Sequence, residues 1–344
     1  MGIATRRWER PGSAGLSFTE IGLGTAPLGN LYRAISDAEA EAAMEAAWDE
    51  GLRYFDTAPL YGLGLAETRL NRFLRGRPRD AFLLSTKIGR LLRAAPPDRR
   101  DGIGKWFDVP SRTGVFDYSR DGAMRSLEAS LERLGVDRID IVFAHDLDIF
   151  THGSAAARDA RLAEFMEGAH GALVELRAAG VIGAFGLGVN EWQACQWVAE
   201  RGDPDLFLLA GRYTLLEQGA LDSFLPLCLA RGLGVVIGGP FNSGILATGA
   251  RPGAHYDYEP APPAVMARVA RIEALCRAHD VAMATAALRF PLLHPAVVSV
   301  IPGGQAAAEV RANARAAAAP VPAALWAALR AEGLIRADAP VHSP

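Results

Sequence analysis

The sequence predicts an α/β fold of the (β/α)8 barrel type. Short apolar runs typical of strands alternate with longer Ala- and Glu-rich stretches of helical periodicity. The strand-like runs number eight along the 344 residues. Parallel strands need a crossover connection, usually a helix, and eight such units close most naturally into a barrel. An open doubly wound sheet is the alternative fold.

The candidate strands are short, apolar or β-branched, and bounded by turn residues. They span residues 20–24, 52–56, 82–86, 139–144, 184–188, 206–210, 234–237 and 298–301. Several candidate helices carry end signals: Ser36 with Glu39 is a capping-box pattern, and Gly135 and Gly180 follow helical stretches. These helices span residues 36–50, 120–134, 161–179, 191–201, 220–231 and 265–279.

Three segments exceed a minimal barrel. The run LSF before residue 20 suits one arm of a hairpin that covers the bottom of the barrel. Residues 89–118 and 242–263 form long loops after strands 3 and 7, and loops this long are usually functional. Because loops that follow strands lie at the C-terminal mouth, both should border the substrate. Residues 312–324, with Trp326, suggest a final helix, and the whole chain, 1–344, is expected to form one domain.

Charge and composition argue against several kinds of partner. The net charge of −3, from 36 basic and 39 acidic residues, gives no basic footprint for nucleic acid or an anionic membrane. Apolar runs are too short for a membrane span, and the N-terminus lacks the apolar core of a secretory signal. The three cysteines have no metal-like spacing. We expect a cytoplasmic protein without a metal; its oligomeric state is left open.

Four reactive side chains follow neighbouring strands. Asp56 ends the second candidate strand, Tyr61 lies in the loop after it, Lys87 ends the third, and His145 follows the fourth. All four are expected at one mouth of the barrel. A neighbouring ammonium favours the phenolate, so Lys87 would bring the pKa of Tyr61 toward the working range. Asp56 would hold Lys87 charged, and His145 would hydrogen-bond the substrate oxygen.

The segments that carry these residues, FDTAPLYGLGLAE, STKIG and FAHD, resemble the signature stretches of the aldo-keto reductase superfamily in order and spacing. The runs TAPLGNLYR and STKIGRLLR resemble more closely the branch that contains D-threo-aldose 1-dehydrogenases (L-fucose dehydrogenases) and pyridoxal 4-dehydrogenases. The resemblance implies a barrel enzyme that binds a nicotinamide dinucleotide across its mouth. It also implies that Asp56, Tyr61, Lys87 and His145 are the catalytic residues.

The resemblance also assigns cofactor contacts. Asn190 matches a residue that binds the carboxamide, Gly303, Gly304 and Gln305 match the phosphate loop, and Asn313 lies near the adenine. The glycine-rich loop after the first strand should place Gly24 and Thr25 near the nicotinamide or substrate, and the loop after the seventh supplies Gly238 and Pro240.

This chain departs from the NADP-preferring pattern. Those enzymes commonly have a Lys and an Arg where this chain has Gly303 and Glu309, and a carboxylate repels a 2′-phosphate. NAD is therefore the expected cofactor, with Arg311 as the residue that would permit NADP. Ala210 stands where a Gln is common, and Gly238 where an aromatic ring often stacks on the nicotinamide.

The expected function is NAD(P)-dependent oxidation of an aldose at its anomeric carbon to the lactone, with Tyr61 as the general acid or base. Tyr32, Trp106, Arg212 and Asn242 are candidates for substrate contacts at the mouth. For Trp106 a hydrophobic anchor, and for Arg212 an ion pair with Glu217, are the alternatives.

Three other functions compete with this expectation. Pyridoxal oxidation or general aldehyde and ketone reduction would use the same residues. A channel-associated binding subunit would be expected to have lost part of the set of four, which is complete here. A metal-dependent barrel hydrolase needs clustered ligands, and His145 with Asp146 is the only close pair.

Overall fold

Eight parallel strands form the centre of the computed structural model, which describes residues 2–10, 15–96 and 106–341. Each of the eight predicted strands is present, with boundaries shifted by a few residues. Neighbouring strands pair in chain order, and the sheet runs from the last strand to the first. The strands are β3 (Leu23–Gly24), β4 (Tyr54–Asp56), β5 (Leu83–Ile88), β8 (Ile139–His145), β9 (Ile182–Val189), β10 (Leu206–Ala210), β11 (Gly234–Gly238) and β14 (Val297–Ile301).

The barrel closes where β3 meets β14. Single parallel bridges join Ile21 to Val300 and Gly24 to Gly303. The amide of Gly22 donates to the Val300 carbonyl at 2.9 Å, and the amide of Val300 donates to that of Glu20 at 2.9 Å. A Cβ on Gly22 would lie 2.7 Å from the Tyr54 carbonyl oxygen, so this closely packed seam needs a glycine. The predicted (β/α)8 barrel is confirmed.

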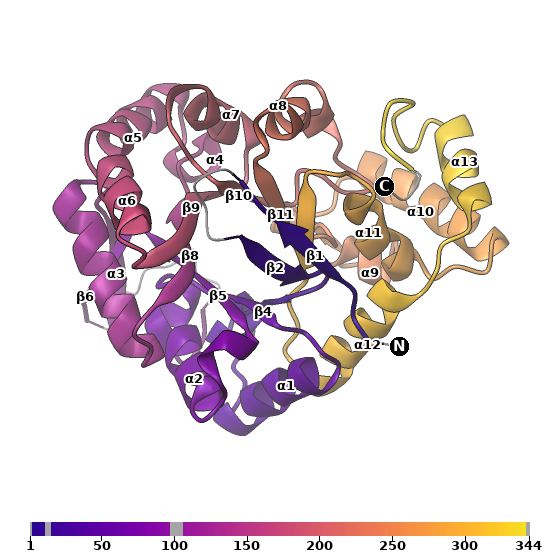
Figure 1. Cartoon of the computed structure of the whole chain (residues 1–344). Coiled ribbons are helices and arrows are strands. Elements are labelled where there is room, and N and C mark those ends of the chain that lie inside the picture. The colour runs from indigo at the N-terminus through magenta and orange to yellow at the C-terminus, as the bar shows by residue number, and fades with distance from the viewer. Residues whose placement is uncertain (1, 11–14, 97–105, 342–344) are drawn as a thin grey trace.

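Helices surround the strands in Figure 1, and barrel strands alternate with helices along the chain. The capping box predicted at Ser36 and Glu39 is confirmed, and Gly135 ends its helix in the left-handed conformation. The helices are α1 (Asp37–Asp49), α2 (Leu65–Leu74), α3 (Arg120–Leu134), α4 (Ile149–His152), α5 (Ala155–Glu167), α6 (Ala169–Ala178), α7 (Trp192–Arg201), α8 (Phe224–Arg231), α9 (Ile245–Thr248), α10 (Pro263–Ala278), α11 (Met283–Leu292), α12 (Ala307–Ala318) and α13 (Ala323–Ala331).

Two predicted helices are each two helices in the structure. The stretch 161–179 is divided into α5 and α6 at Gly168, where a Cβ would lie 2.7 Å from the amide nitrogen of Arg120. The close approach of that backbone explains the break. The final helix expected over 312–324 is divided into α12 and α13 by Pro320 and Pro322, because a proline cannot donate the helical hydrogen bond.

The two long loops contain structure of their own. Residues 89–118 hold an antiparallel hairpin of β6 (Arg90–Ala94) and β7 (Arg112–Phe116), and residues 97–105 lie outside the described part. The loop after β11 holds α9 and a short hairpin of β12 (His255–Tyr256) and β13 (Glu259–Pro260). Both loops follow the carboxyl ends of their strands and therefore lie at the mouth.

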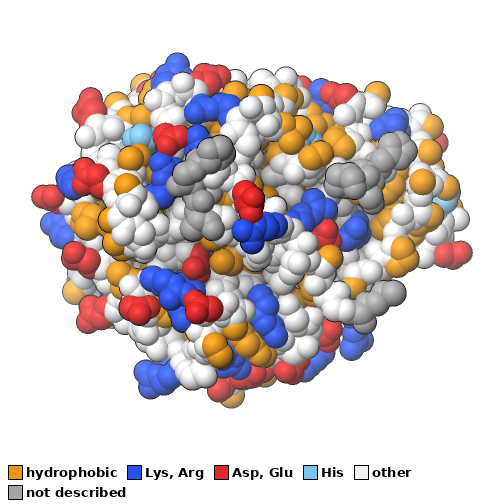
Figure 2. All heavy atoms as spheres, viewed as in Figure 1, with side chains coloured by type: hydrophobic (Ala, Val, Ile, Leu, Met, Phe, Trp, Pro, Cys, Tyr) orange, Lys and Arg blue, Asp and Glu red, His pale blue; other side chains and the backbone are white. Residues whose placement is uncertain are grey.

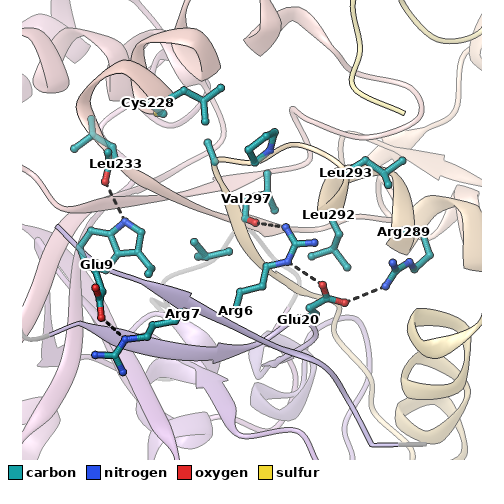
Figure 3. Close-up of a pocket in the computed structure, with 16 residues that line it drawn as sticks. Arg6, Arg7, Glu9, Glu20, Cys228, Leu233, Arg289, Leu292, Leu293 and Val297 are labelled. Carbon is teal, nitrogen blue, oxygen red and sulfur yellow. Dashed lines mark hydrogen bonds and ion pairs between the residues drawn. The ribbon is translucent and has the colours of Figure 1, made fainter. Parts of the chain in front are cut away.

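A hairpin of β1 (Thr5–Trp8) and β2 (Leu16–Thr19) covers the opposite end of the barrel, as the LSF run predicted. It crosses the centre of the ring of strands in Figure 1. Figure 3 shows Arg6 of β1 and Arg289 of α11 converging on Glu20, at 2.8 and 3.0 Å. Trp8 donates its ring N–H to the Gly232 carbonyl at 3.1 Å. The N-terminal end of the barrel is therefore closed by paired groups.

The face shown in Figure 2 carries acidic and basic side chains intermixed, without a large patch of one sign. This distribution agrees with the balanced composition. Within the described ranges, no helix is long and apolar enough to cross a membrane. The three cysteines are buried and unpaired, and burial raises the pKa of each thiol.

Candidate active site

The four predicted catalytic side chains gather at the C-terminal mouth. Asp56 is the last residue of β4, Lys87 lies near the end of β5, and His145 is the last residue of β8. Tyr61 lies in a 3-10 turn directly after β4. The side chains of Asp56, Lys87 and His145 are buried, so each needs a partner or a chemical task.

Asp56 and Lys87 form a buried ion pair. Lys87 Nζ donates to Asp56 Oδ2 at 2.7 Å and to the Thr57 carbonyl at 2.8 Å. Ser85 Oγ donates to Asp56 Oδ1 at 2.7 Å. Burial raises the pKa of Asp56, and the charge of Lys87 opposes that rise. The pair fixes the ammonium at the floor of the mouth.

Tyr61 lies between Lys87 and His145. Lys87 Nζ is 4.7 Å from the centroid of the Tyr61 ring, and the rings of Tyr61 and His145 meet edge to face at 5.9 Å between centroids. The expected downward shift of the Tyr61 pKa is wrong for this structure. Burial raises the pKa well above its usual value, and the charges of Asp56 and Asp146 raise it further. The ammonium of Lys87 donates to the Asp56 carboxylate and the Thr57 carbonyl, and the carboxylate offsets part of its effect on the phenol.

His145 is held as a neutral imidazole. Burial lowers its pKa well below the usual value, and the charges of Lys87 and Arg90 lower it further. Tyr118 donates its hydroxyl to the His145 carbonyl at 2.6 Å and so fixes the end of β8. Asp146 Oδ1 lies 3.4 Å from His145 Nε2. A neutral imidazole carries one N–H, which can donate to a substrate oxygen.

A cavity of about 370 Å³ opens beside this group. It is lined by Asp56 and Tyr61 and by eight of the ten residues predicted to hold the cofactor. Thr25 and Asn313 are not in the lining. These eight are Gly24, Asn190, Gly238, Pro240, Gly303, Gly304, Gln305 and Glu309. The cavity volume is in the range of small-molecule sites.

The two residues outside the lining lie next to it. The Thr25 amide donates to the Asp56 carbonyl at 2.9 Å, and its buried hydroxyl has no partner among the described residues. Asn313 Nδ2 donates to the Gly303 carbonyl at 3.2 Å and so supports the loop after β14.

Polar contacts shape the end of the cavity near α12. Gln305 Nε2 donates to the Leu31 carbonyl at 2.8 Å, which ties the loop after β14 to the loop after β3. The Gln305 amide donates to Glu309 Oε2 at 2.8 Å. Arg311 points elsewhere, toward Asp49 at 3.4 Å and Glu50 at 3.8 Å at the C-terminal end of the neighbouring α1.

Small residues keep the cavity open. A Cβ on Gly303 would lie 2.5 Å from Pro27 Cγ, and one on Gly238 would lie 3.1 Å from Leu208 Cδ2. Ala210, where a Gln was the common residue, also lines the cavity. A planar ring can therefore approach the backbone of β10 and β11. The apolar floor, the amide of Asn190 and the N-terminus of α12, which favours anions, fit a nicotinamide dinucleotide.

The four predicted substrate residues have different surroundings. Tyr32 lines the cavity and is 51% exposed, so it is available to a ligand. The ring of Trp106 lies 6.2 Å from that of Tyr61, and its buried N–H has no partner among the described residues. Arg212 pairs with Asp257 at 2.7 Å, and not with Glu217 as the alternative held. The Asn242 amide already bonds to Thr214 at 2.6 Å and to the Gly211 carbonyl at 3.0 Å.

Sequence reasoning missed three residues at the mouth. Asp257 and Tyr258 form the two-residue turn of the β12–β13 hairpin, and both line the cavity. Both have positive φ, 50° and 65°, typical of a turn that normally takes Asn and Gly. Arg90 pairs with Asp146 at 2.8 Å. A two-residue Asp-Tyr turn between polar stretches carries no distinctive sequence signal. Within the described ranges, no cluster of three or more His, Cys, Asp or Glu residues could hold a metal ion.

Comparisons with known proteins agree with this geometry. A family model described as the Aldo/keto reductase family matches residues 20–332. A pyridoxal 4-dehydrogenase from Microbacterium luteolum is 44% identical, covering 94% of this chain and 96% of that protein. A D-threo-aldose 1-dehydrogenase from a Pseudomonas species is also 44% identical, with the same coverage. The holo form of an aldo-keto reductase from Bacillus halodurans has a TM-score of 0.73 at 23% identity, covering 97% of each chain, and so supports the fold.

Proposed function

Because the chain belongs to the aldo/keto reductase family, it is a nicotinamide-dependent oxidoreductase, and we propose that it oxidises an aldose at the anomeric carbon to the lactone. The observation that carries the proposal is the approach of Lys87 and His145 to the ring of Tyr61, which lines the cavity together with Asp56. An aldose in its ring form is a cyclic hemiacetal. Removal of a hydride from its anomeric carbon and a proton from its hydroxyl gives the lactone.

Tyr61 is the proposed base. Its phenolate oxygen takes the hydroxyl proton while the anomeric C–H bond breaks, and the C–O bond becomes a carbonyl. The oxidised nicotinamide, when bound, supplies the acceptor for the hydride. Lys87 lies 4.7 Å from the Tyr61 ring centroid and stabilises the charge of the phenolate. His145 donates its N–H to the reacting oxygen and sets the direction of the C–H bond. The reverse reaction uses Tyr61 as the acid.

NAD is the proposed cofactor. Glu309 lines the cavity and accepts a hydrogen bond from the Gln305 amide. A carboxylate therefore lies at the end of the site near α12. It disfavours the added charge of a 2′-phosphate and can accept from a ribose hydroxyl. Arg311, the residue that would permit NADP, is directed to Asp49 and Glu50 at the C-terminal end of α1.

Pyridoxal is the second candidate substrate. The relative named as a pyridoxal 4-dehydrogenase matches as well as the aldose dehydrogenase does. Trp106 and Tyr258 provide aromatic surface near Tyr61 and in the cavity lining, which suits a flat heteroaromatic ring. Pyridoxal also closes to a cyclic hemiacetal, so the same residues would perform the same oxidation.

A substrate panel tests these proposals. Oxidation of several aldoses, including L-fucose, and of pyridoxal is followed at the nicotinamide absorbance band with NAD and with NADP. We expect an aldose to have the highest kcat/KM, with NAD preferred by about tenfold or more. Oxidation of pyridoxal alone would replace the first candidate with the second. Equal kcat/KM values with NADP would contradict the cofactor proposal.

A further inference from the structure

Asp146 directly follows His145 in an unusual conformation. Its φ is +59°, in the left-handed region that few residues other than glycine, Asn and Asp adopt. Its amide donates to the Gly188 carbonyl at 3.0 Å, which continues the pairing of β8 with β9. The turn brings the carboxylate back beside the imidazole, with Oδ1 3.4 Å from His145 Nε2.

Arg90 holds this carboxylate by one oxygen. Its Nε and Nη2 lie 2.9 and 2.8 Å from Asp146 Oδ2. The guanidinium also lies 4.3 Å from the centroid of the Phe116 ring, which steadies it from the other hairpin strand. With Oδ2 held by Arg90, Oδ1 faces the imidazole. The side chains of Arg90 and Asp146 are 13% and 11% exposed, so the pair is nearly buried but not closed off from the mouth.

The carboxylate also determines which imidazole nitrogen carries the proton. His145 Nδ1 is buried and has no hydrogen-bond partner among the described residues. Nε2 lies beside Asp146 Oδ1, so a proton on Nε2 is stabilised by the negative charge. A donor, the Nε2–H, and an acceptor, Oδ1, then lie 3.4 Å apart, and the imidazole meets the ring of Tyr61, which lines the cavity.

That spacing matches two oxygens on neighbouring carbons. Hydroxyl oxygens in a gauche arrangement lie about 3 Å apart, so both can be reached by adjacent protein groups. The reacting oxygen of a hemiacetal accepts from Nε2–H, and a hydroxyl on the next carbon donates to a carboxylate. Ring-form aldoses carry such a hydroxyl at C2. In pyridoxal the C3 hydroxyl is one carbon further from the aldehyde carbon, but it lies on the same side of the ring as the aldehyde group and can approach the same oxygen.

We propose that Asp146, held by Arg90, binds a hydroxyl that lies beside the reacting oxygen, the C2 hydroxyl of an aldose or the C3 hydroxyl of pyridoxal, and so selects hemiacetals that carry such a hydroxyl. The inference rests on the proposed oxidation of a hemiacetal and adds the residue that selects the substrate. It explains why the carboxylate lies in a left-handed turn at the mouth, where its charge also reaches Tyr61 and raises the pKa of that phenol.

The test compares two substrates in two proteins. The kcat/KM values of L-fucose and 2-deoxy-L-fucose are measured for the wild type and for Asp146→Asn; if pyridoxal is the better substrate, pyridoxal and 3-deoxypyridoxal take their place. A hydrogen bond to a charged group predicts that the wild type loses about 10- to 100-fold on the deoxy substrate. Any effect of the variant on Tyr61 is common to both substrates, so the ratio of their kcat/KM values is the readout. The variant is expected to lose the advantage of the hydroxylated substrate and to treat the two substrates within about threefold of each other.

Asp140→Asn is the matched control. Asp140 lies on the same strand, β8, and pairs with Arg79 at 2.7 Å with similar exposure, but at the opposite end of the barrel. Asp140→Asn should keep the wild-type ratio of kcat/KM between the hydroxylated and the deoxy substrate. Asn tolerates a positive φ, so Asp146→Asn is expected to fold, and thermal unfolding of both variants checks this.

Each outcome separates the two proposals. A wild type that oxidises both substrates equally, or an Asp146→Asn variant that discriminates as strongly as the wild type, would overturn the role of Asp146 and leave the proposed function standing. A wild type that oxidises neither L-fucose nor pyridoxal with either nucleotide would overturn the proposed function and this inference with it.

Discussion

The two ends of β8 each carry an aspartate paired with an arginine from a segment next to β5, yet the two pairs have different surroundings. At the barrel bottom, Asp140 Oδ2 accepts hydrogen bonds from the Arg79 guanidinium and from the Leu84 amide, both at 2.7 Å. Arg79 donates further to the carbonyls of Phe82 and Arg138, both at 3.1 Å. At the mouth, Asp146 presents one oxygen to a neutral imidazole that contacts the ring of Tyr61.

The same contrast extends to the whole barrel. At the mouth, the buried polar atoms Thr25 Oγ1, Thr57 Oγ1, Trp106 Nε1 and His145 Nδ1 lack partners among the described residues. The described non-glycine residues with positive φ, apart from Asp280, all lie in loops that follow barrel strands. Unpartnered buried polar atoms also occur elsewhere, as at Arg79 Nε at the barrel bottom. Backbone strain is costly, and in the described residues it collects in the loops of the mouth, where a bound ligand can compensate for it.

Among substitutions that test the difference between the two ends of the barrel, we expect the largest effect at Tyr61, on kcat. Tyr61→Phe keeps the ring packing against Trp106 and His145 but removes the proton acceptor. We expect kcat to fall about 10²- to 10⁴-fold, with the melting temperature nearly unchanged. Steady-state kinetics and thermal unfolding of the same preparation measure both. Activity close to wild type would remove Tyr61 from proton transfer.

The next largest effect compares a buried and a partly exposed ion pair. Lys87→Met leaves Asp56 buried without its counter-ion, so unfolding in urea should show a loss of about 3–5 kcal/mol. In Arg79→Met, Asp140 keeps the hydrogen bond from the Leu84 amide, so we expect a smaller loss of unfolding free energy, about 1–2 kcal/mol. Equal losses would show that the mouth is no more sensitive to an unpaired charge than the bottom.

A pH profile sharpens the assignment of Tyr61. Because burial raises its pKa well above the usual value, the phenol stays protonated at neutral pH. Oxidation needs the phenolate, so kcat/KM for oxidation should rise about tenfold per pH unit below that pKa, while reduction stays nearly flat. Asp146→Asn removes a negative charge that raises the pKa, so its oxidation profile should move to lower pH. An unmoved profile would contradict the electrostatic coupling.

The smallest effect is expected at the bottom. Glu20→Gln weakens its ion pairs with Arg6 and Arg289, which are partly exposed. We expect a loss of about 1 kcal/mol in unfolding free energy and unchanged kcat/KM. A clear change in kcat/KM would show that the two ends are energetically coupled.

The alternation of strands and helices made the barrel predictable, because each strand is apolar and each helix has its own end signals. Gly168 was not recognised as a break, since the Ser119–Arg120 backbone that displaces the helix lies far away in sequence. Pro320 and Pro322 did offer a local signal for the break between α12 and α13. Local patterns record strands and caps; they do not record which distant backbone approaches a helix.

The residues of the candidate site were predictable where they follow strand ends, as Asp56, Lys87 and His145 do. The partners that these residues find in other loops were not predictable from the sequence. Arg212 pairs with Asp257, which reaches it only because the β12–β13 hairpin folds over the mouth. Asp146 was noticed beside His145 only as a poor metal pair, because its left-handed backbone, which aims the carboxylate at the imidazole, is not visible in the sequence. The direction of the Tyr61 pKa required the burial that only the fold reveals.

Because the barrel closes between β3 and β14, segments that are synthesised early and late both line the cavity. One wall comes from Gly24 and Tyr32, the other from Ile301 and Glu309, so the first and last parts of the barrel enclose the ligand together. A growing chain cannot complete this cavity until β14 and the start of α12 have left the ribosome. A nucleotide bound across the seam would hold the two ends of the sheet together and favour the closed barrel by mass action.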